Sequence, residues 1–551
     1  MDRTVVYPAR RIITMDSRRP TASHVAVRAG RVLAVGGLAE VASWGAHTID
    51  DRFADKVLMP GLVEGHGHMM TGGIWRYAYV GHIDRVSPDG RRWPAVRDNA
   101  SLVARLREAA AGMPADQPLL GWGLDPLFLD GPRLSRRELD QVSSERPIAI
   151  LHSNGHLMTA NSAALRIAGY DQDTRVTGVA MGDDGQPTGE LQEMAAMMPV
   201  MRRLKFNMDA ISKGSAAILA YAETARRAGV TTIADLGRAL SGDDVEALLA
   251  ITGRDDFPIR LTPTLIAHYK PAAELIADAL AFRARSTDKL RLGAVKIIVD
   301  GSIQGFTARL KWPGYYRGAD HGIWNVAPDT LNSLVEALNA AGLHIHVHVN
   351  GDEASEAALD AFERALASHP RPDHRHTLQH CQLADTAQFE RMKALGLCVN
   401  LFANHLYYFG DKHYEVTVGP DRAERMNACG TAIALGVPLA IHSDTPITPL
   451  GPLFTAWCAV NRRTESGRVL GPAERISVDA ALRAITLGAA YTMKMDHEIG
   501  SIAVGKWADF AVLADDPLAV APEALKDVRV EGTVLAGRPM MDSVLEPEPA
   551  G

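Results

Sequence analysis

The strongest constraint on this chain is a series of eight short strand-like segments that alternate with helical stretches such as DTLNSLVEALNAAG. Alternating strands and helices form parallel sheets, and eight such units close into a barrel. The sequence therefore predicts an α/β fold, a (β/α)8 TIM barrel, with functional residues at the carboxyl ends of the strands. In chain order the segments are LVEGHGH, VTTIADLG, IRLTPTLIAHY, GAVKIIVDGS, GLHIHVHVNGD, HTLQHCQL, GLCVNLFANH and VPLAIHSDTP.

Residues that bind metal ions or carry protons close five of these segments. His66 and His68 are two residues apart, so on a strand both imidazoles point to the same side. An ion of the zinc class takes imidazole and carboxylate ligands, and a catalytic site leaves one position for water. We therefore expect one or two divalent ions, zinc in the first instance. The remaining predicted ligands are Lys296, His348, His380 and Asp444.

Most of the 20 histidines must be bystanders. Of the three in HIHVH, only His348 lies at the carboxyl end of its strand, so the other two are expected to be structural. The same argument selects His380 from DHRHTLQH.

Lys296 is the unusual member of this set, because a buried ammonium group that faces cations is repelled and desolvated. We expect its pKa to fall. A neutral amine can react with carbon dioxide to form a carbamate that bridges two metal ions. Alternatively, an unmodified Lys296 forms an ion pair with Asp300 or binds a substrate carboxylate.

Both ends of the chain carry short alternating strands with glycine turns, which predicts one β-sandwich built from the two termini. The predicted domains are residues 1–58 for the first part of the sandwich, 59–490 for the metal-dependent hydrolase barrel and 491–551 for the second part. A long stretch, about 69–227, follows the first barrel strand and is interpreted as an insertion.

Composition excludes several classes of protein. The 551 residues are 47% hydrophobic and 22% charged, with a net charge of −7 and no Lys/Arg-rich run, so no nucleic-acid partner is expected. No apolar stretch is long enough to span a membrane, and no signal peptide is evident. Four cysteines without a CxxC motif indicate reduced thiols. We expect a cytoplasmic protein; the oligomeric state stays open, with a homodimer as one expectation.

Together these motifs resemble the amidohydrolase superfamily, and most of all its family 3 branch, which includes N-substituted formamide deformylases. Further matching motifs are RPIAILHSNGHLMTANSAAL, PTGELQE, HVHVNGDEA and GSIAVGKWADFAVL. The resemblance implies the barrel and the sandwich, and it favours the carbamate on Lys296. Its metal ligands fall on His66, His68, Lys296, His348, His380 and Asp444.

Three residues depart from the family pattern. Glu64 precedes the first histidine pair where the superfamily usually has Asp, and Gln379 stands where branch members often have Glu. Phe306 occupies a position that is basic in many members, which indicates an apolar or aromatic substrate group there.

The expected reaction is hydrolysis of a small-molecule amide, N-formyl, N-acyl or a related linear amide, by metal-activated hydroxide. Asp444 is the predicted general acid and base. His405 is expected to stabilise the oxyanion; its alternative is a loop histidine packed on Tyr407 and Tyr408. Predicted substrate contacts are His156, Asn161, Gln304, Phe306 and, in the GWGLDP turn, Trp122.

Two other functions fit the same pattern. A mononuclear deaminase or cyclic amidohydrolase would keep one metal and leave Lys296 unmodified. A non-catalytic metal-binding regulator would retain the fold without needing the complete ligand set.

Overall fold

The computed structural model describes residues 3–206, 211–267, 270–318 and 321–541. These residues form two compact units. One contains the described residues of the ranges 1–68, 222–299 and 326–551, and the other contains those of 69–221 and 300–325. The second unit begins with the predicted insertion, but it also includes the segment after the lysine strand, which the sequence did not group with it.

Eight parallel strands of the first unit form the predicted barrel, in the order in which they occur along the chain. They are β6 (Leu62–Gly67), β15 (Val230–Arg238), β16 (Arg260–Ile266), β17 (Val295–Ile298), β18 (Ile345–Val349), β19 (Thr377–His380), β20 (Cys398–Leu401) and β21 (Leu439–Ile441). The predicted α/β barrel is therefore confirmed.

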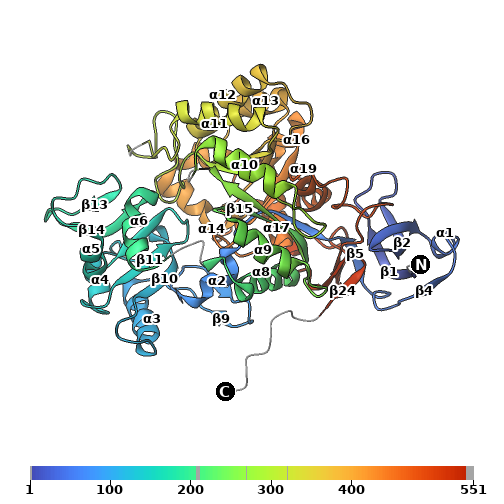
Figure 1. Cartoon of the computed structure of the whole chain (residues 1–551), viewed down its shortest axis with the longest axis horizontal. Helices are drawn as coiled ribbons and strands as arrows, with labels where there is room; N and C mark the ends of the chain where they lie inside the picture. The colour runs from blue at the N-terminus through green and yellow to red at the C-terminus, as the bar shows by residue number, and fades with distance from the viewer. Residues whose placement is uncertain (1–2, 207–210, 268–269, 319–320, 542–551) are drawn as a thin grey trace. The chain divides into compact units, whose positions relative to one another are not determined.

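Helices connect the barrel strands and lie around them (Figure 1). The main ones are α8 (Ser215–Arg227), α9 (Gly242–Thr252), α10 (Ala272–Arg283), α11 (Pro328–Ala340), α12 (Asp352–Ser368), α13 (Thr386–Leu395), α14 (Asn404–Lys412), α15 (Gly419–Arg425), α16 (Cys429–Leu435), α17 (Pro452–Asn461), α18 (Val478–Arg483) and α19 (Ala489–Thr492). Within the described residues, none of the helices has the length and apolar character needed to cross a membrane.

The barrel closes between its first and last strands. Gly67 and Thr445 form a parallel bridge, and the His68 amide donates to the Thr445 carbonyl at 2.9 Å. Next to this bridge the buried Glu64 carboxyl accepts from the Ser443 hydroxyl at 2.8 Å and from the Ser443 amide at 3.2 Å. The closure therefore brings the end of β6 beside the segment that follows β21.

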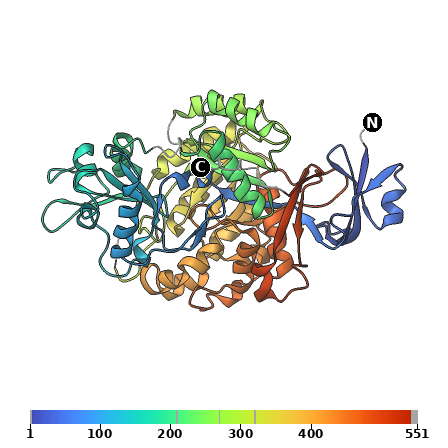
Figure 2. The ribbon, with the colours of Figure 1, turned by 90° about the horizontal axis from the view of Figure 1, so that it is seen from below.

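The sequence predicted a β-sandwich built from both termini; in the structure, strands from both termini pair in a single sheet (Figure 2). Its order is β24-β23-β22-β5-β1-β2-β3, with β4 paired to β1. The cluster of apolar side chains on this sheet also draws on both ends of the chain, with Tyr7 and Phe53 from one and Phe510 and Val534 from the other. The strands are β1 (Thr4–Ile13), β2 (Thr21–Arg28), β3 (Arg31–Gly36), β4 (His47–Ile49), β5 (Val57–Pro60), β22 (Phe510–Leu513), β23 (Val530–Leu535) and β24 (Arg538–Met540).

The second unit is built on a six-stranded mixed sheet of order β13-β14-β12-β11-β10-β7. Its strands are β7 (Ala78–Tyr79), β10 (Leu119–Leu124), β11 (Ile148–His152), β12 (Leu157–Ala160), β13 (Val179–Met181) and β14 (Pro187–Gln192). Its longer helices are α3 (Asn99–Ala111), α5 (Ser162–Ala168) and α6 (Glu193–Arg203).

A buried ion pair joins the barrel to the terminal sheet. Arg260 in β16 is 1% exposed, and its Nε and Nη2 donate to the Asp509 carboxylate at 2.8 and 3.1 Å. The same carboxylate accepts from the amide of Ala536, and the guanidinium lies over the Trp507 ring at 4.5 Å. Removing either partner leaves a buried charge uncompensated.

We therefore expect Asp509→Ala to lower the free energy of unfolding by about 3–5 kcal/mol, measured by urea denaturation. Asp479→Ala is the control, because it breaks an exposed pair with Arg483 on one helix and should cost only about 0.3–0.5 kcal/mol. Equal losses in the two variants would contradict a structural role for the Arg260–Asp509 pair.

A second prediction concerns Asp125 in the second unit, residues 69–221 and 300–325, which we call the insertion unit. Burial raises the pKa of Asp125 from 3.8 to about 7, although its carboxylate accepts from the Leu127 amide and the Ser153 hydroxyl. Between about pH 4 and pH 7 the folded chain holds a proton that the unfolded chain releases, so stability falls as pH rises through this range. Asp125→Asn cannot titrate, and its unfolding free energy should lack this slope, which amounts to a few kcal/mol in order of magnitude. Identical pH profiles in urea titrations of the two proteins would contradict this expectation.

Candidate metal centre

The barrel strands bring together histidines and a carboxylate at the carboxyl end of the sheet. His66 lies in β6 and His68 follows it, while Asp444 follows β21 across the closure. The Asp444 Oδ1 lies 3.0 Å from Nε2 of His68 and 3.4 Å from Nε2 of His66. Ligand atoms of these three residues all lie within 4.8 Å of one another, a grouping that could hold a metal ion.

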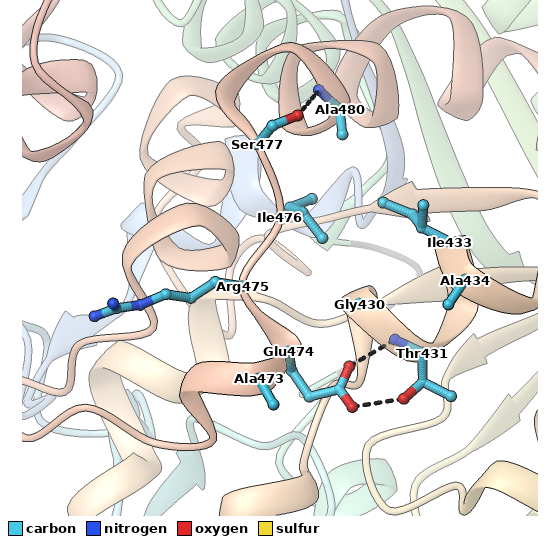
Figure 3. Close-up of a pocket in the computed structure, with 10 residues that line it drawn as sticks. All are labelled: Gly430, Thr431, Ile433, Ala434, Ala473, Glu474, Arg475, Ile476, Ser477 and Ala480. Atoms are coloured by element: carbon cyan, nitrogen blue, oxygen red, sulfur yellow. Dashed lines mark hydrogen bonds between the residues drawn. The ribbon is translucent and has the colours of Figure 1, made fainter.

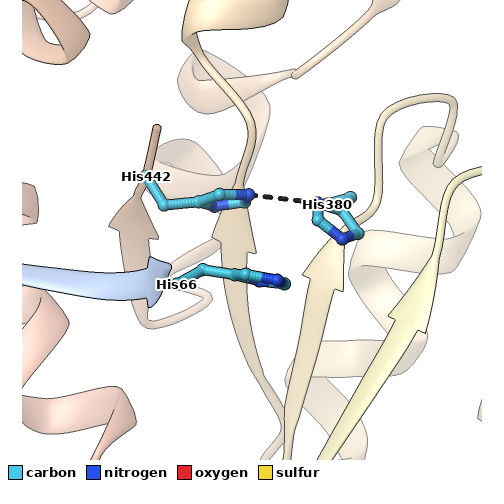
Figure 4. A group of neighbouring side chains, drawn as sticks. All are labelled: His66, His380 and His442. Carbon is cyan, nitrogen blue, oxygen red and sulfur yellow. Dashed lines mark hydrogen bonds between the residues drawn. The ribbon is translucent and has the colours of Figure 1, made fainter. Parts of the chain in front are cut away.

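A second group shares His66. Ligand atoms of His66, His380 and His442 also lie within 4.8 Å of one another, and Nδ1 of His380 is 3.0 Å from Nε2 of His442 (Figure 4). His348 adjoins this group, with its ring centroid 4.6 Å from that of His380. The structure thus brings five predicted ligands close together, with His66 common to both groups.

Sequence reasoning missed His442. The signal was present, because His442 stands two residues before Asp444, as His66 stands two before His68. In the structure the His66 and His442 rings stack at 4.7 Å, so the residue is part of the cluster.

The electrostatics of the cluster favour neutral imidazoles. Burial lowers the pKa values of His66 and His380 well below 6.5, and lowers that of His442 to about 3. The positive charge of Lys296 lowers the pKa values of all three further. Neutral imidazoles keep the lone pairs that a metal ion requires.

Lys296 in β17 is 1% exposed, and its Nζ has no hydrogen-bond partner within the described residues. Burial lowers the pKa of Lys296 to about 7, while Asp444 opposes this shift. Gly237, at φ +107°, adjoins the lysine stem: a Cβ there would lie in ordinary contact with Cγ of Lys296, at 3.6 Å, and closer to Cδ1 of Ile266, at 3.2 Å. The predicted fall in pKa agrees with this environment.

Burial raises the pKa of Glu64 to about 8, and the negative charge of Asp444 raises it further. A carboxyl with this pKa keeps its proton near neutral pH. Glu64 therefore supports the barrel closure without placing a second negative charge beside Asp444.

His405 lies in helix α14 and is 1% exposed. Its Nδ1 is hydrogen-bonded to Nε2 of His413 at 2.9 Å, and its ring stacks on Phe409 at 4.3 Å and lies 4.7 Å from Phe402. The oxyanion role of His405 stays a prediction. Its alternative needs correction, because these contacts place it in a helix rather than in a loop packed on two tyrosines.

Two predicted substrate contacts, Trp122 and Asn161, are held by packing and hydrogen bonds inside the insertion unit. Trp122 lies in strand β10 rather than in a turn, and it is 2% exposed within the apolar core. The Asn161 oxygen accepts from the amides of Ile148 and Ala164 and caps α5, while its nitrogen donates to the carbonyls of Ser143 and Arg146. These contacts do not support the predicted substrate roles of the two residues.

The other three predicted contacts also lie in the insertion unit. Nδ1 of His156 is 2.9 Å from Oε2 of Glu193, an acid that the sequence analysis did not select. Gln304 is buried, and the Phe306 ring lies 5.0 Å from that of Tyr315. Phe306 and Glu193 both have positive φ angles, 59° and 61°, a conformation found at many functional sites. The substrate contacts of His156, Gln304 and Phe306 stay predictions.

One hollow of about 550 Å³ lies on the barrel unit beside α16 (Figure 3). Its only carboxylate, Glu474, accepts from the amide and hydroxyl of Thr431 at 2.7 and 2.5 Å. The lining includes none of the predicted ligands. We assign no chemistry to this hollow.

A (β/α)8 barrel with imidazole, lysine and carboxylate groups at its strand ends defines a metal-dependent hydrolase. A model of the amidohydrolase family matches residues 54–541, and the chain belongs to this family. It is an enzyme of the class that hydrolyses carbon–nitrogen bonds other than peptide bonds.

Individual relatives are distant but match over almost their whole length. The chain is 28% identical over 520 residues to protein LONG AFTER FAR-RED 3 of Arabidopsis thaliana, covering 91% of this chain and 86% of that protein. It is 26% identical over 559 residues to N-substituted formamide deformylase of Arthrobacter pascens, covering 95% and 96%. An uncharacterised metal-dependent hydrolase from Pyrococcus horikoshii has the same fold, with a TM-score of 0.70 at 19% identity over 94% of this chain and 99% of that one.

The residues at the strand ends fit a divalent ion. Buried neutral imidazoles and a carboxylate are the donors that zinc-class ions take, and the amine of Lys296 lies buried without a hydrogen-bond partner in the described structure.

Proposed function

We propose that the enzyme hydrolyses small linear amides, with N-formyl and N-acyl amines as the substrate class and one or two zinc ions as cofactor. The observation that carries this proposal is the position of Asp444, whose Oδ1 faces the imidazoles of both His66 and His68. The relative from Arthrobacter pascens, named for the deformylation of N-substituted formamides, supports this choice of substrate.

A bound divalent ion supplies Lewis acidity, which lowers the pKa of water and polarises a carbonyl group. Within the chain, Oδ1 of Asp444 is directed at two imidazoles, so its Oδ2 is the atom we assign to proton transfer. It takes a proton from the attacking water and returns it to the leaving nitrogen, which departs as a neutral amine.

We further propose that Lys296 is carbamylated. Its neutral Nζ attacks carbon dioxide, a C–N bond forms, and the nitrogen releases a proton. The support is the burial of this amine, its lack of a hydrogen-bond partner among described residues and its pKa of about 7, which leaves a large neutral fraction near pH 7. The product is an anion with two oxygens, suited to bridging two cations.

Metal content tests the dinuclear form. Elemental analysis of protein purified without chelators should give two ions per chain, and Lys296→Ala should lose about half of them, because the bridging anion is absent. Lys289→Ala is the matched control, since this lysine donates to the carbonyl of Arg254 and should leave metal content unchanged. One ion per chain, unchanged in Lys296→Ala, would establish the mononuclear alternative.

Turnover tests the proton shuttle. Asp444→Asn keeps an oxygen ligand but cannot take a proton, so kcat on an N-substituted formamide should fall about 10²–10⁴-fold. Retention of metal in this variant separates loss of proton transfer from loss of the ion. If the metal-loaded wild-type chain hydrolyses esters or lactones but no linear amide, the proposed substrate class is wrong.

A further inference from the structure

A network of two buried amide side chains contacts the histidine cluster and has no part in the proposed reaction. It consists of Gln379 in β19 and Asn400 in β20, both with no exposed surface. We propose, on the basis of the proposed function, that these two residues hold the imidazole proton of His66 and of His442 on Nδ1. Each Nε2 then presents its lone pair to the metal ion.

The first contact is at Gln379. Its Oε1 lies 2.8 Å from Nδ1 of His66 and accepts a hydrogen bond from Nδ2 of Asn400 at 3.0 Å. An amide oxygen only accepts hydrogen bonds, so Nδ1 of His66 must carry the proton. The Nε2 of His66 faces Asp444 and is left as the basic nitrogen.

The second contact follows from the first. Because Asn400 uses its nitrogen on Gln379, its oxygen is directed at His442, 3.1 Å from Nδ1. The same argument places the proton of His442 on Nδ1. Its Nε2, which lies 3.0 Å from Nδ1 of His380 (Figure 4), then carries the lone pair.

The amide group of Gln379 also contacts His346, on the side away from His66. The Nε2 of Gln379 lies 2.9 Å from Nδ1 of His346, which accepts when it carries no proton. Reversing Gln379 and Asn400 together would move the protons of His66 and His442 to Nε2 and block both lone pairs. His346, not selected as a ligand, therefore has a positioning role within the barrel.

Groups of this kind strengthen metal binding because they fix the tautomer and the ring orientation of each ligand. Losing such a partner typically costs about 10–100-fold in metal affinity. The two amides and the three histidines that they contact are all at most 3% exposed, so water does not compete for their hydrogen bonds.

The test is zinc affinity of the full chain, measured by competition with a chelator, beside thermal stability of the metal-free protein. Gln379→Met keeps the side-chain length but removes both polar atoms, and Asn400→Leu breaks the second contact. We expect affinity to fall about 10–100-fold in each. Gln379→Glu retains an acceptor for His66 and Asn400, so it should restore affinity close to the wild-type value.

The control is Gln388→Met. Gln388 is 1% exposed and donates to the carbonyl of Asp352, while its side-chain oxygen accepts from the amide of Asp385, the N-cap residue of α13. None of its hydrogen bonds within the described structure reaches the histidine cluster. It should lose stability and keep zinc affinity. An equal loss of affinity in Gln388→Met and Gln379→Met would mean general destabilisation and would overturn the inference.

The remaining outcomes separate this inference from the proposed function. Wild-type affinity in both Gln379→Met and Asn400→Leu overturns the inference alone, since the loaded wild-type enzyme remains. A wild-type chain that binds no zinc overturns the proposed function and this inference with it. If Gln379→Met does not fold, Asn400→Leu and Gln379→Glu decide: loss in the first with retention in the second supports the inference, and any other pattern overturns it.

Discussion

The site depends on the closure of the barrel between its first and last strands. Strand β21 is only three residues long, and the closure rests on the Gly67–Thr445 bridge and on the contacts of Glu64 with Ser443. Without this closure the Asp444 carboxylate would not lie beside His66, in β6, and His68, which follows it. The longer side chain of Glu64, where the superfamily usually has Asp, reaches Ser443 across the closure. Its raised pKa keeps this contact uncharged.

Burial then determines the chemistry at the strand ends. His380 and Asp444 have φ angles of 72° and 55°, a region that costs non-glycine residues free energy and that is tolerated where surrounding contacts hold it. Both side chains are thereby directed into one cluster with His66. Burial also lowers the pKa values of His66 and His380, so both imidazoles are neutral and keep lone pairs for a cation.

Much of this arrangement could be predicted from the sequence. The eight strands and the ligands at their carboxyl ends follow from local patterns, since periodicity and the position of a residue within a strand are local properties. The roles of Asn400 and Gln379 could not be derived, because they depend on the register between β19, β20 and β21. The helix cap by Asn161 was missed for a similar reason, as its partners come from residues 143–164 folded together. Local sequence pointed to five side chains of the cluster, but not to the groups that contact them.

The geometry also bears on the number of ions. His66 belongs to both groups of possible ligands, yet one imidazole nitrogen binds a single ion. Two ions would therefore need a further ligand, and an unmodified lysine ammonium cannot supply one, since its charge already lowers the pKa values of His66, His380 and His442. Carbamylation of Lys296 would replace this positive charge with a negative one at the same buried position. On the present proposal, a single modification thus removes the repulsion and provides the missing bridge, whereas the mononuclear alternative must tolerate a buried amine beside a cation.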